Sequence, residues 1–304
     1  MTSTLDKPVK APTFQAVSLR RKLTNNTATV LVTLSVVIAV VPLIWVLYSV
    51  ITKGLKIVLD SGWWTHSQSG MTAFMAGGGV YHALVGTLLQ GLFCAVISIP
   101  VGVFVGIYLV EYGGGTRLGK LTTFMVDILT GVPSIVAALF IYALWVATLG
   151  FQRSGFAVSL ALVLLMIPVI VRSTEEMLRI VPMDLREASY ALGVPKWKTI
   201  ARIVIPTALS GIVTGVMLAL ARVMGETAPL LILVGYSQAM NFDMFNGFMG
   251  SLPGMMYDQT SAGAGANPVP TDRLWGAALT LIVLIAILNV GARFIAKFFA
   301  PKKV

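Results

Sequence analysis

Six long apolar runs dominate the sequence and constrain its fold more than any other feature. A helix needs about 20 mostly apolar residues to cross the hydrocarbon core of a bilayer. Backbone polar groups in lipid must be hydrogen-bonded within the element, so continuous runs favour helices, whereas a β-barrel would alternate apolar and polar residues. We expect an all-α integral membrane protein with six transmembrane helices, at about 28–51, 83–110, 122–149, 154–171, 207–234 and 274–296.

Composition and charge support a membrane protein and indicate its orientation. Hydrophobic residues make up 57% of the chain and charged residues 11%, well below the roughly 25% of soluble domains. The basic residues lie mostly on one side of the predicted membrane, and the positive-inside rule makes that side cytoplasmic, with both termini. The asymmetry explains the formal charge of +10 without nucleic-acid binding. The opposite side carries only Lys53, Lys56, Arg153 and Arg273.

One membrane domain accounts for nearly the whole chain. We place it at 28–298, between a cytoplasmic N-terminal tail at 1–27 and a cytoplasmic C-terminal tail at 299–304. Pro133, inside the third run, is expected to kink its helix. His66 and His82 precede the second run and are interpreted as solvated loop residues.

The loop at 172–206, between the fourth and fifth runs, is too long for a plain connection. Its first half places apolar residues at helical spacing, Gly193 and Pro195 then break the pattern, and 196–206 resumes it. We expect a helix, a sharp turn and a second helix that protrude from the membrane as a docking element.

The stretch 187-EASYALGVPKWKTIARIVIP-206 resembles the EAA motif of ABC-importer permeases. Gly193 has the spacing that suits the turn, and Ser189, at the third position, is the one residue that departs from the motif, which has alanine there. In that family the loop fits into a cleft of the ATPase subunit. The resemblance therefore implies a coupling role for Glu187, Ala188, Leu192, Gly193, Val194, Pro195, Lys196 and Trp197.

Three further stretches, 78-GGVYHALVGTLL-89, 130-TGVPSIV-136 and 222-RVMGETAPL-230, resemble the permeases of phosphate importers. The ending Gly-Glu-Thr-Ala-Pro-Leu looks most like the PstA type, whereas the PstC type diverges after a similar arginine and glutamate. The resemblance implies a MetI-like permease fold in the inner (plasma) membrane. It also implies a PstC-like second permease, a PstB-like ATPase dimer and a PstS-like extracytoplasmic phosphate-binding protein as partners.

The chain lacks the Gly-x-x-x-x-Gly-Lys-Ser/Thr loop that binds nucleotide phosphates. We therefore expect a transport subunit rather than an enzyme, with no cofactor of its own and with ATP and Mg on the partner ATPase.

Arg222 and Glu226 lie inside the fifth apolar run. An isolated charge at the centre of a membrane helix costs ~2.5–3.5 kcal/mol, so such residues face a partner, a bundle interior or a watery cavity. If the helix begins near residue 207, Arg222 lies about 22 Å along it, near the midplane. A spacing of four predicts that both side chains share one helix face.

This pair gives two hypotheses. In the first, Arg222 forms part of a phosphate passage and Glu226 holds and partly neutralises it, with Ser134 and Thr227 also lining the pathway. In the second, the two charges form a buried ion pair that only ties helices together. Of the remaining acids, Asp127 is interpreted as complementing a helix dipole at the start of the third helix, and Glu175, Glu176 and Asp184 as solvated.

Other functions remain open at the level of sequence. A PstC-like subunit would carry a similar arginine and glutamate. A permease for another oxyanion, such as sulfate, molybdate or phosphonate, is the other alternative, and substrate competition in vesicles separates these substrates. A membrane enzyme acting on lipid-linked substrates would need convergent acids, histidines or a metal, which the sequence does not offer. A channel would keep its uptake after the ATPase is inactivated.

Overall fold

The computed structural model describes residues 18–299, so most of the predicted N-terminal tail and the end of the C-terminal tail lie outside the described residues. The chain divides into two compact units, Met1–Ser49 and Val50–Val304. Helix α1 (Leu19–Val58) contributes to both. It begins well before residue 28, because apolarity marks the part of a helix that suits lipid and not the point where the helix starts.

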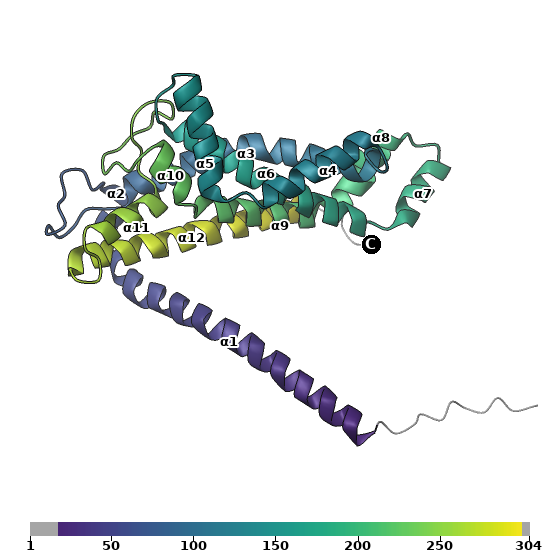
Figure 1. Cartoon of the computed structure of the whole chain (residues 1–304), viewed down its shortest axis with the longest axis horizontal. Helices are drawn as coiled ribbons and strands as arrows, with labels where there is room; N and C mark the ends of the chain where they lie inside the picture. Colours follow the sequence, from purple (N-terminus) through teal and green to yellow (C-terminus); the bar gives the residue numbers. More distant parts are fainter. Residues whose placement is uncertain (1–17, 300–304) are drawn as a thin grey trace, which may run out of the picture. The chain divides into compact units, whose positions relative to one another are not determined.

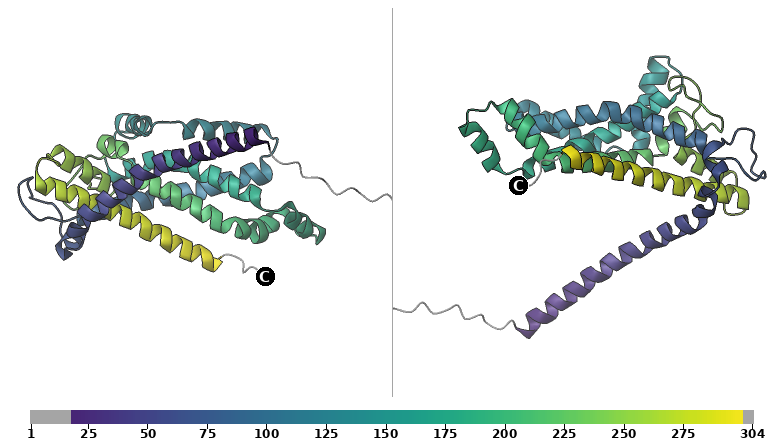
Figure 2. Two further views of the ribbon diagram at one scale, coloured as in Figure 1. Left: turned by 90° about the horizontal axis from the view of Figure 1, so that it is seen from below. Right: turned by 180° about the vertical axis from the view of Figure 1, so that it is seen from behind.

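Four long helices lie side by side in Val50–Val304: α3 (Tyr81–Ile107), α6 (Gly155–Ile180), α9 (Ile205–Met224) and α12 (Pro268–Phe299) (Figures 1 and 2). Helix α6 is central, since it packs on both α3 and α9 and most of its apolar stretch is buried. The approach of α3 to α6 requires glycine. A Cβ added at Gly102 would lie 2.7 Å from the Ile170 Cβ, and one at Gly106 would lie 2.8 Å from the Thr174 Cβ.

The third apolar run is two helices rather than one. Helix α4 (Arg117–Thr130) ends at the Gly131 cap, and α5 (Ser134–Ile141) continues into the π-helical segment η2 (Tyr142–Thr148). The two parts are bent by 106°. The expected kink at Pro133 is confirmed, but it is a full break, because proline has no N–H to donate and disfavours helical geometry in the residue before it.

The fifth apolar run is also divided. Helix α9 ends at Met224 with Gly225 as its cap, and a short helix α10 (Ala228–Leu233) begins after Thr227. Pro229 lies in the first turn of α10, where its missing N–H costs nothing. The prediction of one helix over 207–234 is therefore wrong, although the whole run remains apolar.

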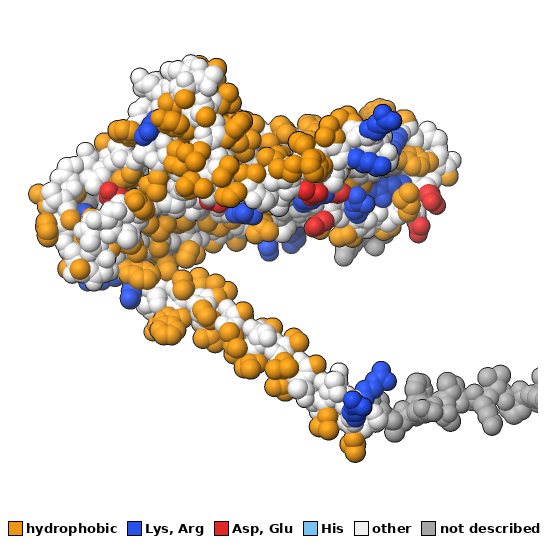
Figure 3. Space-filling model, viewed as in Figure 1, with side chains coloured by type: hydrophobic (Ala, Val, Ile, Leu, Met, Phe, Trp, Pro, Cys, Tyr) orange, Lys and Arg blue, Asp and Glu red, His pale blue; other side chains and the backbone are white. Residues whose placement is uncertain are grey.

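The ends of the long helices carry the shorter elements. At one end, η1 (Tyr108–Tyr112) extends α3, and α7 (Met183–Ala191), α8 (Lys196–Thr199) and the π-helical η3 (Ile200–Val204) connect α6 to α9. The opposite end carries α2 (Ser61–Thr65) and α11 (Leu252–Ser261). Figure 3 shows charged side chains of both signs gathered at the α7–α8 end and a largely apolar surface between the two ends.

Within the described residues, five helices are long and apolar enough to cross a membrane, and the bent α4–α5 pair makes a sixth candidate span. The predicted all-α, six-span architecture is thus confirmed, with the third span broken.

Candidate functional site

Arg222 and Glu226 flank the break at the end of α9. Arg222 lies in the last turn of the helix with its side chain exposed, whereas Glu226 lies beyond the Gly225 cap and is half-buried. The prediction that they share one helix face is wrong, because the helix ends between them. Neither residue belongs to any of the four ion pairs formed within residues 18–299.

The exposed face of α9 that carries Arg222 is more polar than the rest of the helix. Thr207, Ser210, Thr214 and Leu218 lie on it at helical spacing before Arg222, and all are exposed. The opposite face carries Ala208, Ile212 and the other residues buried against α6 and α12. The Thr207 and Thr214 hydroxyls donate to the carbonyls of Ile203 and Ser210 in the same continuous helical segment. The guanidinium of Arg222 is therefore the group on this face that indicates contact with a partner or with water rather than with lipid tails.

Glu226 borders a small hollow of about 10 Å³ whose lining includes Thr87 and Gln90 of α3. The Thr87 hydroxyl accepts a hydrogen bond from the Leu252 N–H at 2.8 Å. The Gln90 side chain is buried, and its amide nitrogen has no hydrogen-bond partner in the described chain. Sequence reasoning missed Gln90, and its signal was an amide in the middle of an otherwise apolar helix.

The two helix breaks lie near one another, because α5 packs against α10. Ser134 is the first residue of α5 and Thr227 precedes α10, and both are half-buried. Discontinuous helices with irregular backbone at membrane depth are typical of transporter substrate sites, since the freed backbone groups then face a cavity or a substrate. The roles of Ser134, Thr227, Arg222 and Glu226 in a pathway stay predictions.

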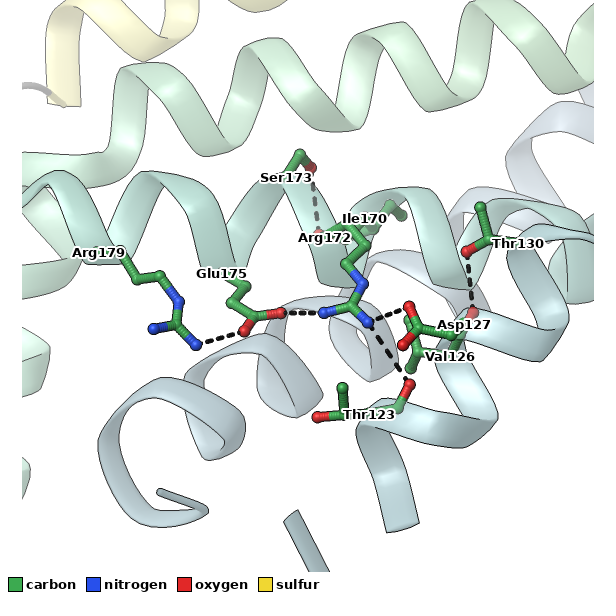
Figure 4. Close-up of polar contacts among 9 residues, drawn as sticks. All are labelled: Thr123, Val126, Asp127, Thr130, Ile170, Arg172, Ser173, Glu175 and Arg179. Carbon is green, nitrogen blue, oxygen red and sulfur yellow. Dashed lines mark hydrogen bonds and ion pairs between the residues drawn. The ribbon is translucent and has the colours of Figure 1, made fainter. Parts of the chain in front are cut away.

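A chain of four charged side chains joins α4 to α6 (Figure 4). Arg172 pairs with Asp127 of α4 and, at 2.7 Å, with Glu175, which also binds Arg179 at 2.7 Å. Arg172 donates a further hydrogen bond to the Thr123 carbonyl at 3.5 Å.

Two sequence interpretations are corrected by this network. Asp127 lies in the second half of α4 and neutralises Arg172, so it does not complement a dipole at a helix start. Glu175 is buried rather than solvated, with 7% of its surface exposed. The signal that was missed is the spacing of three and four between residues 172, 175 and 179 on one helix.

The predicted helix–turn–helix at 172–206 is confirmed in outline, although α6 extends to Ile180 before α7 begins. Gly193 turns the chain with φ +74°, a conformation that favours glycine. The Ser189 hydroxyl bonds the Thr199 hydroxyl at 2.8 Å and joins α7 to the start of the return helix. The turn presents Leu192 with 83% of its surface exposed and Trp197 with 65%.

Of the other residues predicted to couple to the ATPase, most are also on the surface of the hairpin. Glu187, Ala188 and Pro195 are exposed and Val194 is half-buried. Lys196 is exposed but occupied, because its Nζ donates to the Glu111 carbonyl and lies 4.7 Å from the centre of the Tyr112 ring. The sequence did not predict these contacts of Lys196 within its own chain.

A nearly buried ion pair connects α7 to η1. Arg186 Nη2 lies 3.0 Å from Glu111 Oε1, with 8% and 6% of the two side chains exposed. The same guanidinium donates to the carbonyls of Leu178 at 3.0 Å and Val181 at 2.8 Å, at the end of α6. It therefore supplies donors to carbonyls at a helix end, where acceptors outnumber the backbone N–H groups that can reach them.

The α2–α11 end holds a polar cluster of its own. His82 Nε2 lies 2.8 Å from the Tyr236 hydroxyl, which donates to Gln68 Oε1 at 3.3 Å. His82 is buried, so its interpretation as a solvated loop residue is wrong. Burial raises the pKa of Tyr236 above its usual range. Arg273 clamps this end through the carbonyls of residues 72, 75 and 77. No group of His, Cys, Asp and Glu side chains in residues 18–299 is placed to hold a metal ion.

Comparisons with known proteins place this geometry in a family. Residues 98–304 match the family described as "Binding-protein-dependent transport system inner membrane component". The chain belongs to this family of permeases. The match begins in α3 and includes both helix breaks and the α7–α8 hairpin.

Curated relatives narrow the membership to PstA-type permeases. The "Phosphate transport system permease protein PstA 1" of Mycobacterium tuberculosis (strain CDC 1551 / Oshkosh) is 55% identical over 98% of this chain and 97% of its own. The PstA of Mycobacterium leprae (strain TN) is 56% identical over 99% and 97%. The PstA of Pasteurella multocida (strain Pm70) is 38% identical over 93% and 96%.

Solved structures support the fold of this PstA-type permease. A chain of the inward-facing MetNI methionine ABC transporter matches with a TM-score of 0.55 at 21% identity, over 73% of this chain and 94% of its own. A chain of a bacterial ABC transporter involved in the import of the acidic polysaccharide alginate matches with a TM-score of 0.61 at 12% identity, over 91% of this chain and 98% of its own. The predicted MetI-like permease fold is confirmed.

Proposed function

We propose that this chain is the PstA-type permease subunit of an ATP-driven importer of inorganic phosphate, and that Arg222 forms part of the passage. One observation carries the proposal: Arg222 is a permanent charge on an apolar helix whose guanidinium is exposed and unpaired by any carboxylate in residues 18–299. Its counter-charge must come from outside the described chain, and a passing anion provides it.

The chemistry of Arg222 suits a tetrahedral oxyanion. Its guanidinium offers two parallel N–H donors to neighbouring phosphate oxygens and stays charged throughout. The position in the last turn of α9 lets the helix-end carbonyls moderate the positive charge, which is the role that the sequence assigned to Glu226. Moderated attraction favours conduction, because a passage must release its ion as well as bind it.

Glu226 has a second role in this proposal. Phosphate at neutral pH keeps a P–OH group, which sulfate lacks, and a carboxylate accepts a hydrogen bond from it. Glu226 is half-buried beside Thr87 and Gln90, where water is scarce and such a bond is strengthened. Together, Arg222 and Glu226 recognise the charge and the proton of the substrate.

The α7–α8 hairpin is the docking site for the partner ATPase in this proposal. Leu192 and Trp197 expose large apolar surfaces at the tip, which is costly in water and favourable inside a groove. The excess of basic residues at this end makes it cytoplasmic, along with both termini. A PstC-like permease covers the exposed face of α9, and an extracytoplasmic phosphate-binding protein delivers the substrate at the α2–α11 end.

The sequence lacks the phosphate-binding loop Gly-x-x-x-x-Gly-Lys-Ser/Thr, so in this proposal ATP and Mg bind on the ATPase dimer. Closure of the two ATPases moves the hairpins, and the rocking of the two permeases exposes the midplane site to alternate sides of the membrane.

Phosphate uptake by the complete importer in vesicles tests the role of Arg222. We expect Arg222→Ala to lower uptake by about 100-fold, equivalent to ~2.7 kcal/mol, because a charge-assisted double hydrogen bond is lost. Arg222→Lys keeps the charge without the paired donors and gives an intermediate loss. Arg293→Ala, an exposed arginine of α12, is the matched control and stays within twofold. Normal uptake by Arg222→Ala in membranes with normal amounts of the chain would contradict the proposal.

Two further measurements separate the alternatives. In the first, sulfate, molybdate or a phosphonate is added in excess during phosphate uptake. Unchanged phosphate uptake supports selectivity for phosphate, whereas strong inhibition identifies another oxyanion as the substrate. Uptake that persists with a catalytically inactive ATPase would identify a channel.

A further inference from the structure

Helix α7 is held to its own chain by polar contacts. Only Arg186 and Ser189 are buried among its nine residues, and both use hydrogen bonds to reach other elements. Its apolar residues Met183, Leu185 and Tyr190 are exposed. Figures 1 and 2 show α7 standing clear of the long helices. Movement imposed on α7 therefore reaches the membrane helices through a small number of identifiable atoms.

Both arms of the hairpin converge on one residue, Glu111. From α7, Arg186 Nη2 lies 3.0 Å from Glu111 Oε1. From α8, Lys196 Nζ donates to the Glu111 main-chain carbonyl and lies over the Tyr112 ring. The side chain of Glu111 is thus bound by α7 and its main-chain carbonyl by α8. Both arms of the hairpin are therefore attached to η1, the extension of α3.

A hollow of about 470 Å³ lies between these elements, lined by Glu111, Met183, Arg186, Tyr190 and Lys196 among others. Packed apolar side chains do not fill this space, so they do not transmit the movement of α7 to η1 there. The Arg186–Glu111 contact lies in the wall of this hollow as a directional bond, which resists sliding more than apolar contacts do.

Helix α3 connects this attachment to the proposed pathway. Its π-helical extension η1 contains Glu111, and α3 itself contains Gln90, which lies 21 residues earlier and lines the same small hollow as Glu226. At ~1.5 Å per residue, the two positions are about 31 Å apart along a continuous helical segment. A rigid element with an attachment at one end and site residues along its length can bias the site when the attachment moves.

We infer that Glu111 is a positioning residue for transport: it transmits the movement of the α7–α8 hairpin to α3 through its buried ion pair with Arg186 and the contact of its carbonyl with Lys196. The inference deepens the proposed function and rests on it, because the hairpin moves only if an ATPase docks there. Glu111 touches neither phosphate nor nucleotide, so its loss uncouples the two activities and leaves each partner able to bind.

The complete importer in proteoliposomes tests this inference, with phosphate uptake and ATP hydrolysis measured on the same vesicles. Glu111→Gln keeps the shape of the side chain and removes its charge. We expect the complex to assemble with ATP hydrolysis within twofold of the unaltered importer, while the phosphate transported per ATP falls at least about fivefold, a shift of ~1 kcal/mol in coupling. Arg186→Gln also lowers the phosphate transported per ATP, and it costs additional stability because it removes the hydrogen bonds to the Leu178 and Val181 carbonyls. The ratio in the double variant is no lower than in the more affected single variant, since the ion pair is broken in all three.

Arg179→Gln is the matched control, because Arg179 borders the same hollow but pairs with Glu175 and not with Glu111. Its phosphate-to-ATP ratio stays within twofold. An unchanged ratio in Glu111→Gln overturns the inference. Loss of the ATPase from the purified Glu111→Gln complex also overturns it, because the pair would then hold the docking surface in shape rather than transmit movement.

A second variant keeps the test informative if Glu111→Gln is poorly produced. Lys196→Met leaves the ion pair intact and removes the donor to the Glu111 carbonyl, and it lowers the ratio by about threefold, less than Glu111→Gln and more than the control. Failure of the proposed function is recognised separately: the unaltered importer then shows no ATP-dependent uptake, and a cysteine at Leu192 (Leu192→Cys) forms no crosslink to the ATPase. With both of these intact, an unchanged ratio refutes the inference alone.

Discussion

Arg186 and Arg222 are both arginines in a largely apolar chain, and they differ in where their partners come from. Arg186 is nearly buried and is bonded by one carboxylate and two carbonyls of its own chain. Arg222 is exposed on α9 and forms no ion pair within residues 18–299. The first makes a fixed joint between elements, whereas the second remains available to a ligand.

Stability alone does not explain the fixed joint. Taking two charges out of water costs as much as their attraction returns, and apolar replacements of buried ion pairs are often neutral or stabilising. What an ion pair adds is geometry, because it specifies which atoms meet and at what distance. A permease whose hairpin moves needs this fixed geometry to keep the hairpin in register with the membrane helices. Variants of the two arginines and of their surroundings therefore distinguish an arginine paired within the chain from one paired outside it.

Among variants that keep both arginines, the largest effect is expected from giving Arg222 a partner within its own chain. Leu218 is 67% exposed and precedes Arg222 by one helical turn, so Leu218→Glu places a carboxylate beside the guanidinium at little packing cost within its own chain. Glutamate four residues before a basic residue is the favourable order in a helix. We expect uptake to fall about tenfold, while Leu218→Gln, the neutral control of the same shape, stays within twofold to threefold. Equal effects of the two variants would show that Arg222 does not act as a free charge.

Removing the centre of the internal network should destabilise the fold. Arg172→Gln leaves Glu175, with 10% of its side chain exposed, dependent on Arg179 alone, and it detaches Asp127 of α4 from α6. Breaking a buried pair costs ~3–5 kcal/mol, and the 30% exposure of the Arg172 side chain reduces our expectation to about 2 kcal/mol. A thermal unfolding midpoint lowered by several degrees in detergent would confirm it, and an unchanged midpoint would contradict it.

The sequence predicted the spans well because apolar length is a direct requirement of lipid. It predicted six candidate spans, a helical hairpin within 172–206 and a turn at Gly193, and the structure contains all three. It did not predict that two runs are divided, since lipid selects for apolarity and tolerates a break that other helices cover. Pro133 and the Gly225–Pro229 segment carried the local signal, but a proline in a membrane helix does not by itself distinguish a kink from a break.

The candidate site was predicted less completely. Arg222 and Glu226 stood out because charges in an apolar run are visible in one dimension, but their shared face depended on a helix that ends at Met224. Contacts between distant residues left no such signal. Glu111 and Arg186 are 75 residues apart, and Arg172 and Asp127 are 45 apart, so only the packing of α3, α4 and α6 brings these pairs together.

The turn of the hairpin allows its shape to be tested apart from its charges. Gly193 has φ +74°, and an added Cβ would meet no atom within 4 Å, so Gly193→Ala is penalised only by the backbone conformation, by ~1–2 kcal/mol. We expect about a fivefold weaker retention of the ATPase during purification. Gly193→Asn, whose side chain tolerates this conformation, is the matched control and stays closer to the unaltered chain. A larger loss with asparagine than with alanine would show that contact at the tip, not backbone strain, decides docking.

The smallest effect is expected at the exposed end of the internal network. Arg179 pairs with Glu175 at 2.7 Å, a distance as short as that between Glu175 and Arg172, but 64% of the Arg179 side chain is exposed. Solvent screening and side-chain entropy reduce such a pair to about 0.5 kcal/mol or less. Arg179→Gln should therefore shift the unfolding midpoint by no more than about 2 °C. If it destabilised the protein as much as Arg172→Gln, the number of ion pairs rather than their burial would set the strength of the internal joints, and the distinction drawn between Arg186 and Arg222 would lose its physical basis.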